Sequence, residues 1–335
     1  MNWAKSYAAS FTLNPVDTLT WADIGAVPLA TAIITRTADG DAPELESATL
    51  ECIGDFEPGY HRVVMIAEQD GETERVEVAT LWVGRSSETV DHGFERQSLD
   101  GRSVLIPAEL AVVARGEFAA KGADGAAKAA SMLADCLHAP VSVEGSFRLD
   151  DHFDFEPEST VLEAVWSLLH AGGFCMQVDG HGTVHIRPIP TEPAFLANAD
   201  NAGIIQPGVT RSTSNALPVN RYIAVEGEQV AVAENHTGTG RFERFGIWVD
   251  HYDTAPVRTD GESLERYAYR RGVEEGTVEE TWGYDRRYVP GVYPFDIIRG
   301  TLPDMMGDMR VKTQTITAGH GLMVAETACR EVDTW

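Results

Sequence analysis

The sequence predicts a mainly β fold of the α+β class, in which two β-rich regions flank a middle region that contains helices. Residues 61–83 form two apolar, β-branched runs around Asp70-Gly71, a dipeptide typical of tight hairpin turns. Residues 309–327 alternate apolar and polar side chains on both sides of a second turn at 318–321. Between these regions, residues 160–186 combine a helical apolar stripe with another hairpin. These patterns place strands towards both ends of the chain and helices in the middle.

The first β region is assigned to residues 1–105. Strands are expected at 32–36 and 48–53, where apolar and β-branched side chains are followed by the breakers Gly54 and Pro58. The hairpin around Asp70-Gly71 comes next. Several short strands separated by turns are typical of a barrel or a sandwich, so we expect one of these two architectures.

Helices are expected in the middle region, which is assigned to residues 106–205. Residues 107–113 predict a short helix, and residues 124–137 predict a longer one. The longer segment has apolar side chains that recur on one helical face. These side chains are Ala126, Ala129, Ala130, Leu133 and Leu137. Pro140 follows shortly after and marks the end of the helix.

Residues 160–186 form the clearest unit of the middle region. Thr160 and Glu163 make a capping-box pattern at a helix start, and Gly172-Gly173 ends the helix. The apolar stripe of the helix consists of Leu162, Val165, Trp166 and Leu169. Strands at 174–178 and 184–186 then surround the turn Asp179-Gly180-His181-Gly182. The unit is therefore a helix that leads into a β-hairpin.

The second β region is assigned to residues 206–335, with a helical insertion near 262–275. The residues expected in strands before the insertion are 222–226, 229–233 and 246–249. Residues 264–275 predict a polar helix. Strands at 309–317 and 322–327 form the last hairpin. Two β regions around a middle insert also suggest a distant duplication.

Charge excludes one class of function. The 335 residues include 52 acidic and 26 basic side chains, which gives a formal net charge of -26. Such a surface repels nucleic acid, so we expect no specific nucleic-acid binding. No stretch approaches the ~20 apolar residues of a membrane helix, and no secretory signal is visible, so no membrane partner is expected. The cysteines Cys52, Cys136, Cys175 and Cys329 form no CxxC pair and are interpreted as buried reduced thiols.

Searches for catalytic motifs find no phosphate-binding loop, no zinc-protease motif and no nucleophile elbow. The prediction is therefore a protein without enzyme activity, catalytic residues, cofactor or metal. The acidic stretch 150–158 is interpreted as a solvated linker that leads into the capped helix. A metal role for His181 and His185 is disfavoured, because a turn separates them and they share no helical face.

Several segments resemble baseplate hub proteins of tailed bacteriophages. The helix-hairpin unit 160–188 matches a helix that leads into a hairpin of the form "vD-x-x-G-x-v-x-i" in those proteins. Residues 220–227 look like the start of their second β domain, and residues 288–298 are similar to the segment that enters its final strands. The resemblance covers most of the chain in order, although each matching piece is short.

The resemblance implies two tube-type β-barrel domains, residues 1–105 and 206–335, around the middle α/β insert. Three such chains would form a homotrimeric ring that joins the six-fold tail tube to the three-fold tip or spike. Leu162, Trp166 and Val184 would then be core residues, and Gly180 and Gly182 turn formers. The ring would surround a channel with an acidic lining along which DNA slides, and neutralising that lining would slow DNA ejection.

The same resemblance implies a virion protein of the phage tail tip that is made in the host cytoplasm. Its expected partners are a tail tube or distal tail protein, a tape-measure protein, and a tip or spike protein. A related injection machine that is not a phage would use the same fold. No C-terminal lysin domain is expected, so cell-wall degradation would belong to a partner.

Two alternatives remain open at this point. The first is a carbohydrate-active or peptidoglycan-cleaving tail enzyme, with Asp151, Asp154 and Glu156 as candidate carboxylates. Against it, these carboxylates crowd one stretch, whereas a glycosidase needs a pair that faces across a cleft. The second alternative is a receptor-binding tail module, in which the aromatic side chains Tyr252, Tyr284 and Tyr288 would contact sugar. Against it, tyrosines flanked by Pro and Gly more often pack under loops.

Overall fold

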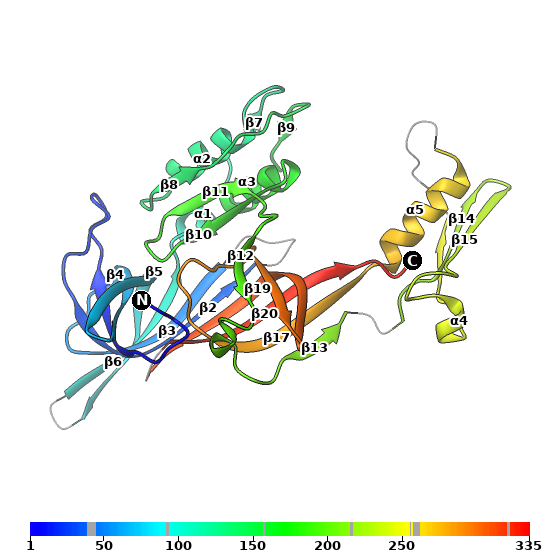
Figure 1. The fold of residues 1–335 in the computed structure, drawn as a ribbon. Helices are drawn as coiled ribbons and strands as arrows, with labels where there is room; N and C mark the ends of the chain where they lie inside the picture. Colours follow the sequence, from blue (N-terminus) through cyan, green and yellow to red (C-terminus); the bar gives the residue numbers. More distant parts are fainter. Residues whose placement is uncertain are drawn as a thin grey trace. The chain divides into compact units, whose positions relative to one another are not determined.

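Strands dominate the chain, which is mainly β and of the α+β class as predicted (Figure 1). The computed structural model describes residues 1–38, 45–91, 94–156, 158–214, 217–254, 256, 262–319 and 322–335. Contacts divide the chain into two compact units. Unit 1 comprises Met1–Val209 and Gly283–Ala328, and unit 2 comprises Thr210–Trp282 and Cys329–Trp335.

Six strands of unit 1 are hydrogen-bonded in a closed circuit, because the last strand pairs with the first. In their order around the circuit, the strands are β1 (Ala8–Pro15), β4 (Gly59–Gln69), β5 (Glu72–Asp91), β6 (Phe94–Ser103), β3 (Leu45–Ile53) and β2 (Val27–Thr37). The circuit closes where Leu13 of β1 pairs with Val27 of β2. The predicted hairpin is confirmed: β4 and β5 pair antiparallel around Asp70 and Gly71, whose φ angles of 52° and 84° fit a tight turn.

Strand β2 also connects the circuit to further strands of the same hydrogen-bonded sheet, because its residues 32–37 pair with residues 313–318 of β19. We call these further strands the second sheet. The strands of this sheet, in order, are β12 (Pro193–Ala197), β18 (Ile297–Leu302), β19 (Met305–Ala318), β20 (Leu322–Val332), β17 (Val278–Arg287) and β13 (Thr210–Thr213). Buried side chains of β19 and β20, such as Ile316 and Val324, share one apolar cluster with Ile34 and Leu50 of the circuit. The two sheets are therefore joined by hydrogen bonds and by a common core. Residues 320 and 321 of the predicted turn at 318–321 lie outside the described residues.

Between the two sets of strands, the chain forms the helices and small sheets of the middle region. The elements are α1 (Ile106–Leu110), β7 (Phe118–Ala119), α2 (Gly125–Ala134), β8 (Val141–Val143), β9 (Phe153–Asp154), α3 (Val161–Ala171), β10 (Phe174–Val178), β11 (Val184–Pro188) and the short 3-10 helix η1 (Ala202–Ile204). Helix α3 begins at a capping box of Thr160 and Glu163, as predicted. Leu162 and Val184 lie in one buried cluster with α2 residues, and Trp166 is buried against Phe295. The predicted core role of all three residues is confirmed.

In its described residues, unit 2 contains its own three-stranded sheet and two helices. The elements are β14 (Arg221–Glu226), β15 (Gln229–Glu234), α4 (Phe242–Phe245), β16 (Asp250–Asp253) and α5 (Leu264–Gly276). The strand expected at 246–249 is wrong. Gly246 ends α4 in a left-handed conformation with φ 71°, and the next strand starts only at Asp250. Among the described helices, none combines the length and the apolar character that crossing a membrane requires.

Candidate functional site: the hairpin junction and the shared sheet

The turn between β10 and β11 lies directly on the backbone of β5, and glycine makes this approach possible. A Cβ atom added to Gly180 would lie 1.9 Å from the carbonyl oxygen of Glu77. A Cβ atom on Gly182 would lie 2.7 Å from Cβ of Thr80, and Gly182 has a φ of 84°. Gly182 is a turn former, as predicted. Gly180 is required for the close packing of two backbones.

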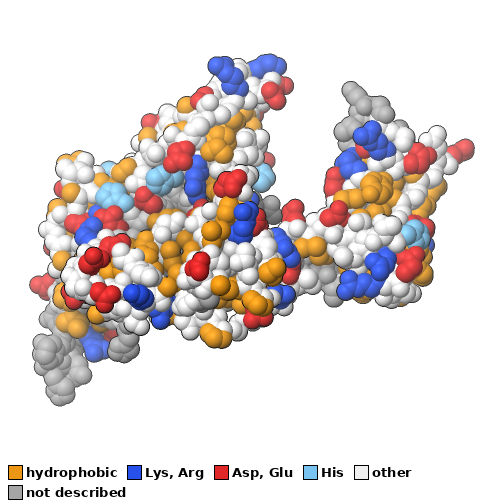
Figure 2. Space-filling view, viewed as in Figure 1, with side chains coloured by type: hydrophobic (Ala, Val, Ile, Leu, Met, Phe, Trp, Pro, Cys, Tyr) orange, Lys and Arg blue, Asp and Glu red, His pale blue; other side chains and the backbone are white. Residues whose placement is uncertain are grey.

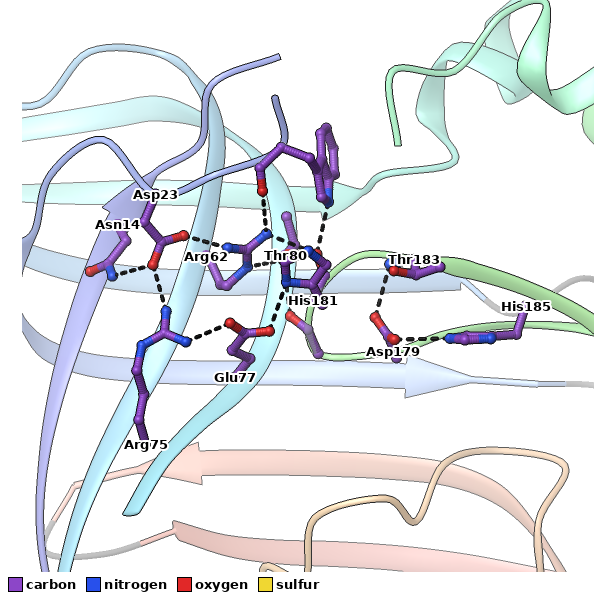
Figure 3. Close-up of polar contacts among 12 residues, drawn as sticks. Asn14, Asp23, Arg62, Arg75, Glu77, Thr80, Asp179, His181, Thr183 and His185 are labelled. Carbon is purple, nitrogen blue, oxygen red and sulfur yellow. Dashed lines mark hydrogen bonds and ion pairs between the residues drawn. The ribbon is translucent and has the colours of Figure 1, made fainter. Parts of the chain in front are cut away.

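Hydrogen bonds to the carbonyl groups of the turn hold it in place (Figure 3). The carbonyl oxygen of His181 accepts from Trp21 Nε1 at 2.9 Å and from Arg62 Nη2 at 3.0 Å. The carbonyl oxygen of Gly180 accepts from Thr80 Oγ1 at 2.9 Å. Donors from β4, from β5 and from the segment between β1 and β2 therefore converge on two consecutive carbonyl groups.

A network of ion pairs surrounds this turn (Figure 3). Arg75 contacts Asp23 and Glu77 at 2.5 Å each, and Asp23 also pairs with Arg62. His181 Nδ1 lies 2.8 Å from Oε2 of Glu77. Burial acts to raise the pKa of Glu77, but hydrogen bonds from Arg75 and His181 outweigh it and hold that pKa below its usual value. The contacts of the folded junction therefore stabilise the charged form of Glu77.

The two histidines of the hairpin have separate partners (Figure 3). His181 contacts Glu77 on β5, whereas His185 Nε2 lies 2.9 Å from Oδ2 of Asp179 within the hairpin. Asp179 also accepts a hydrogen bond from the backbone N–H of Thr183 at 2.8 Å. Each imidazole thus stabilises local structure. Within the described residues, no group of three or more His, Cys, Asp or Glu side chains is placed to hold a metal ion.

The candidate carboxylates of the acidic stretch lie on an exposed segment. The side chains of Asp151 and Asp154 are 77% and 73% exposed, and both contact the imidazole of His152. Glu156 is exposed as well. The structure thus gathers two of the three carboxylates around one surface histidine. They do not face each other across a cleft, which is the arrangement that a glycosidase needs.

The predicted aromatic set and the cysteines are divided between core and surface. Tyr284 and Tyr288 are buried, so the interpretation of these two as sugar contacts is wrong, whereas Tyr252 is 62% exposed. Cys52 and Cys175 are buried as expected, but Cys136 and Cys329 are partly exposed.

Two buried ion pairs join strands of unit 1, and neither was predicted from the sequence. Arg36 on β2 pairs with Glu46 on β3 at 2.6 Å, with both side chains fully buried. Arg286 on β17 pairs with Glu326 on β20 at 2.7 Å. Burial raises the pKa of Glu46, against the attraction of Arg36. The signal that could have revealed these pairs was a charged residue at an inward position of an alternating strand.

The outward face of β3, β2 and β19 carries mostly hydroxyl and apolar side chains, and we call it the shared-sheet face. Its side chains include three uncharged cross-strand rows, and a further pairing of Thr31 with Glu51 places one carboxylate on the same face. The rows are Thr49–Ile33–Thr317, Ser47–Thr35–Thr315 and Leu45–Thr37–Thr313. The hydroxyl of Thr313 contacts that of Thr327 on β20, which extends the face to a fourth strand. Next to β3, the strand β6 contributes the charged residues Asp100 and Arg102.

Uncharged rows of this kind are unusual for a chain with a net charge of -26. On the side of the molecule drawn in Figure 2, Asp and Glu side chains are spread widely, with Lys and Arg scattered among them. The shared-sheet face is exposed and yet built from Thr, Ser and Ile side chains. It is therefore a candidate surface for subunit assembly or for the passage of another molecule, rather than for catalysis.

Comparisons with known proteins identify the fold. No family model and no curated protein matches the sequence. Among solved structures, the chain is similar to the 43 kDa tail protein of prophage MuSo2 from Shewanella oneidensis, with a TM-score of 0.59 and 12% identity. That match covers 95% of this chain and 97% of the other. A tail protein from Neisseria meningitidis MC58 gives a TM-score of 0.58 and 14% identity, over 97% of both chains. The chain thus has the fold of these tail proteins, which confirms at the level of the fold the resemblance seen in the sequence.

Proposed function

We propose that the protein is a structural hub of a phage tail tip or baseplate, without enzyme activity of its own. The observation that carries this proposal is the similarity of fold to two tail proteins over nearly the full length of all three chains. The exposed, clustered carboxylates of the acidic stretch give the enzyme alternative no support.

The strand topology supports a ring of three chains. The closed circuit of six strands would be one tube-type barrel, and the second sheet would contribute another. Three chains would then present six related β structures to a six-fold tail tube, and three-fold symmetry to a tip or spike. Strands β12 and β13 end the order of the second sheet, and open strand edges of this kind are commonly covered by a neighbouring chain.

The shared-sheet face is the surface that we assign to the DNA channel. It continues across both sheets through the pairing of β2 with β19, so it would repeat around a ring without interruption. On β3, β2 and β19 its Thr and Ser rows carry none of the Lys and Arg side chains that bind phosphate groups, and the next strand, β6, adds one residue of each charge, Arg102 and Asp100. The lining would then be largely neutral, in place of the acidic lining that the net charge suggested.

The proposed surroundings follow from this position in a virion. The hub would contact the tail tube or a distal tail protein on one side, and a tip or spike protein on the other. A tape-measure protein would occupy the channel before DNA passes. The protein would be made in the host cytoplasm and become part of the tail tip.

The mass of the protein in solution tests the ring. Light scattering at several concentrations, with imaging of the particles by electron microscopy, should give three times the chain mass of 36.5 kDa and a ring with a central channel. If the isolated chain is monomeric, its copy number in purified tails decides, and three copies per tail support the hub. A monomer together with a copy number that is not a multiple of three contradicts the proposal.

A further inference from the structure

His236 lies between two glutamates that come from different elements of unit 2. Its Nδ1 atom is 2.8 Å from Oε1 of Glu243 on α4, and its Nε2 atom is 3.2 Å from Oε2 of Glu234 at the end of β15. Both nitrogens of one imidazole therefore face carboxylate oxygens. An ionised carboxylate only accepts hydrogen bonds, so each of the two contacts needs an N–H group on the ring.

The two contacts together require the doubly protonated ring. A neutral imidazole has one N–H group and one nitrogen with a lone pair, whereas the imidazolium ion donates from both nitrogens. In the neutral form, one ring nitrogen would therefore lose its contact with a carboxylate. Because Glu234 belongs to β15 and Glu243 to α4, loss of either contact breaks the bridge between the two elements. The His236 side chain is 51% exposed, so the ring exchanges protons with water directly.

Other charged groups at this place favour the ionised form of both glutamates. Arg221 of β14 lies 4.0 Å from Oε1 of Glu234. The hydrogen bond from His236 lowers the pKa of Glu243, and the positive charge of Arg241 at the N-cap of α4 adds to this effect. His236 is therefore the group of this bridge whose charge changes near neutral pH.

The third neighbour of His236 is aromatic. Trp248, in the segment after α4, meets the imidazole edge-on with 5.6 Å between ring centroids, and Phe242 of α4 stacks on the same indole at 4.5 Å. The guanidinium group of Arg221 lies over the Trp248 ring at 5.0 Å, and two hydrogen bonds tie it to Asp250 of β16. A change of charge on His236 thus occurs where α4 packs on the rest of unit 2.

We propose that Glu234, His236 and Glu243 form a pH-dependent clasp that holds α4 on the end of β15. At acidic pH the imidazolium ion bridges the two elements, and at alkaline pH the neutral ring releases one of them and α4 loosens. Helix α4 carries the exposed side chain of Arg244 and leads into Ile247, which is 47% exposed. The clasp therefore controls how firmly unit 2 holds these two side chains in place. The inference does not rest on the proposed function, because it concerns unit 2 alone.

The direction of the pH dependence follows from linkage. The hydrogen bond to Glu243, and after it the one to Glu234, raises the pKa of His236 above its ordinary value. The factor by which the fold raises the proton affinity of the ring is also the factor by which deprotonation weakens the clasp. The stabilisation is therefore fully present below the ordinary histidine pKa of about 6.5 and is lost as the pH rises through the raised pKa.

An NMR titration of the histidine ring signals in the full chain tests the bridge itself. The signal of His236, identified by its loss in His236→Gln, should titrate with a midpoint above about 6.5. In Glu243→Gln the midpoint should be lower than in the wild type, because the ring loses a charged acceptor. A wild-type midpoint at or below the ordinary value, or an unchanged midpoint in Glu243→Gln, overturns the proposal.

Hydrogen exchange tests the release of α4. The backbone N–H of Gly246, which donates to the carbonyl oxygen of Phe242 at 2.7 Å, reports on this helix. Its protection, relative to an unstructured peptide at the same pH, should fall several-fold from about pH 5.5 to about pH 8.5 in the wild type. In His236→Gln the protection should be low at both pH values, while circular dichroism confirms the fold.

His152→Gln is the matched control for the exchange experiment. His152 also contacts two carboxylates, those of Asp151 and Asp154, but both belong to its own surface stretch, so this imidazole joins no separate elements. The variant should keep the wild-type pH dependence at Gly246. A protection of Gly246 that is independent of pH in the wild type, or that changes equally with pH in His236→Gln, shows that His236 does not control α4.

Discussion

At the junction between the hairpin and β5, the absence of one side chain decides where the turn lies. The carbonyl oxygen of Glu77 occupies the space that a Cβ atom of Gly180 would need. The same approach lets Thr80 and Arg62 reach the carbonyl groups of the turn. The hydrogen bonds therefore form only because position 180 is a glycine. These hydrogen bonds in turn attach the middle region to the circuit of strands.

We expect Gly180→Ala to destabilise the protein by about 1–3 kcal/mol, because the hairpin must move away from β5 and stretch its hydrogen bonds. Urea unfolding followed by circular dichroism measures the loss. Gly25→Ala is the control, since a Cβ atom there meets only Pro15 at 3.8 Å, an ordinary contact. Equal stability of the two variants would show that the turn is not held as closely to β5 as described.

Buried charge is the second residue-scale feature of the molecule. Arg36 with Glu46, and Arg286 with Glu326, are enclosed between strands of unit 1. Removal of one partner from such a pair leaves an uncompensated charge and typically costs about 3–5 kcal/mol, whereas an intact pair contributes little to stability. In a wrong strand register, one of these charges would be buried without its partner. The pairs therefore mainly disfavour wrong registers.

At the scale of elements, the helix-hairpin unit folds as its local sequence dictates. Thr160 accepts a hydrogen bond from the backbone N–H of Glu163 at 3.1 Å, and Glu163 accepts one from the backbone N–H of Thr160 at 2.8 Å. The side chains of α3 that follow this cap bury one continuous stripe. Local capping and long-range packing therefore agree on where α3 begins.

We expect Thr160→Ala to lower the free energy of unfolding by about 1 kcal/mol, because the first turn of α3 loses a cap. Thermal unfolding monitored by circular dichroism measures this change. Thr213→Ala, at an exposed strand position of unit 2, serves as the control and should shift the stability by less than about 0.5 kcal/mol. A loss in the control as large as in Thr160→Ala would exclude the cap as its cause.

Elements with strong local signals were predictable, and their assembly was not. The hairpin around Asp70 and Gly71 and the capping box at Thr160 each depend on residues close in sequence, and both are confirmed. The strands at 222–226 and 229–233 also exist, but the sequence contains no sign that they form a separate sheet in unit 2. The Glu77–His181 contact joins residues 104 positions apart, so no local pattern could reveal it.

At the scale of the whole molecule, the largely uncharged shared-sheet face differs from the acidic remainder of the surface. The pairing of β2 with β19 makes one continuous face out of two sheets, and this face carries rows of Thr, Ser and Ile side chains. The net charge of -26 is therefore distributed mostly over other surfaces. A neutral channel lining would neither bind phosphate groups nor hold DNA back by strong repulsion, which suits a passage that DNA crosses once and quickly.

Positive charge on the shared-sheet face should slow DNA ejection. In Thr49→Lys/Thr317→Lys, two exposed positions of one cross-strand row acquire ammonium groups, which would bind the passing phosphates in every subunit of the proposed ring. Triggered ejection from purified virions, followed by the fluorescence of a DNA dye, should be several-fold slower and should recover at high salt. Thr49→Glu/Thr317→Glu is the matched control, because it alters the same side chains without attracting phosphate. If both variants assemble into tails and eject DNA at the wild-type rate, the shared-sheet face does not line the channel.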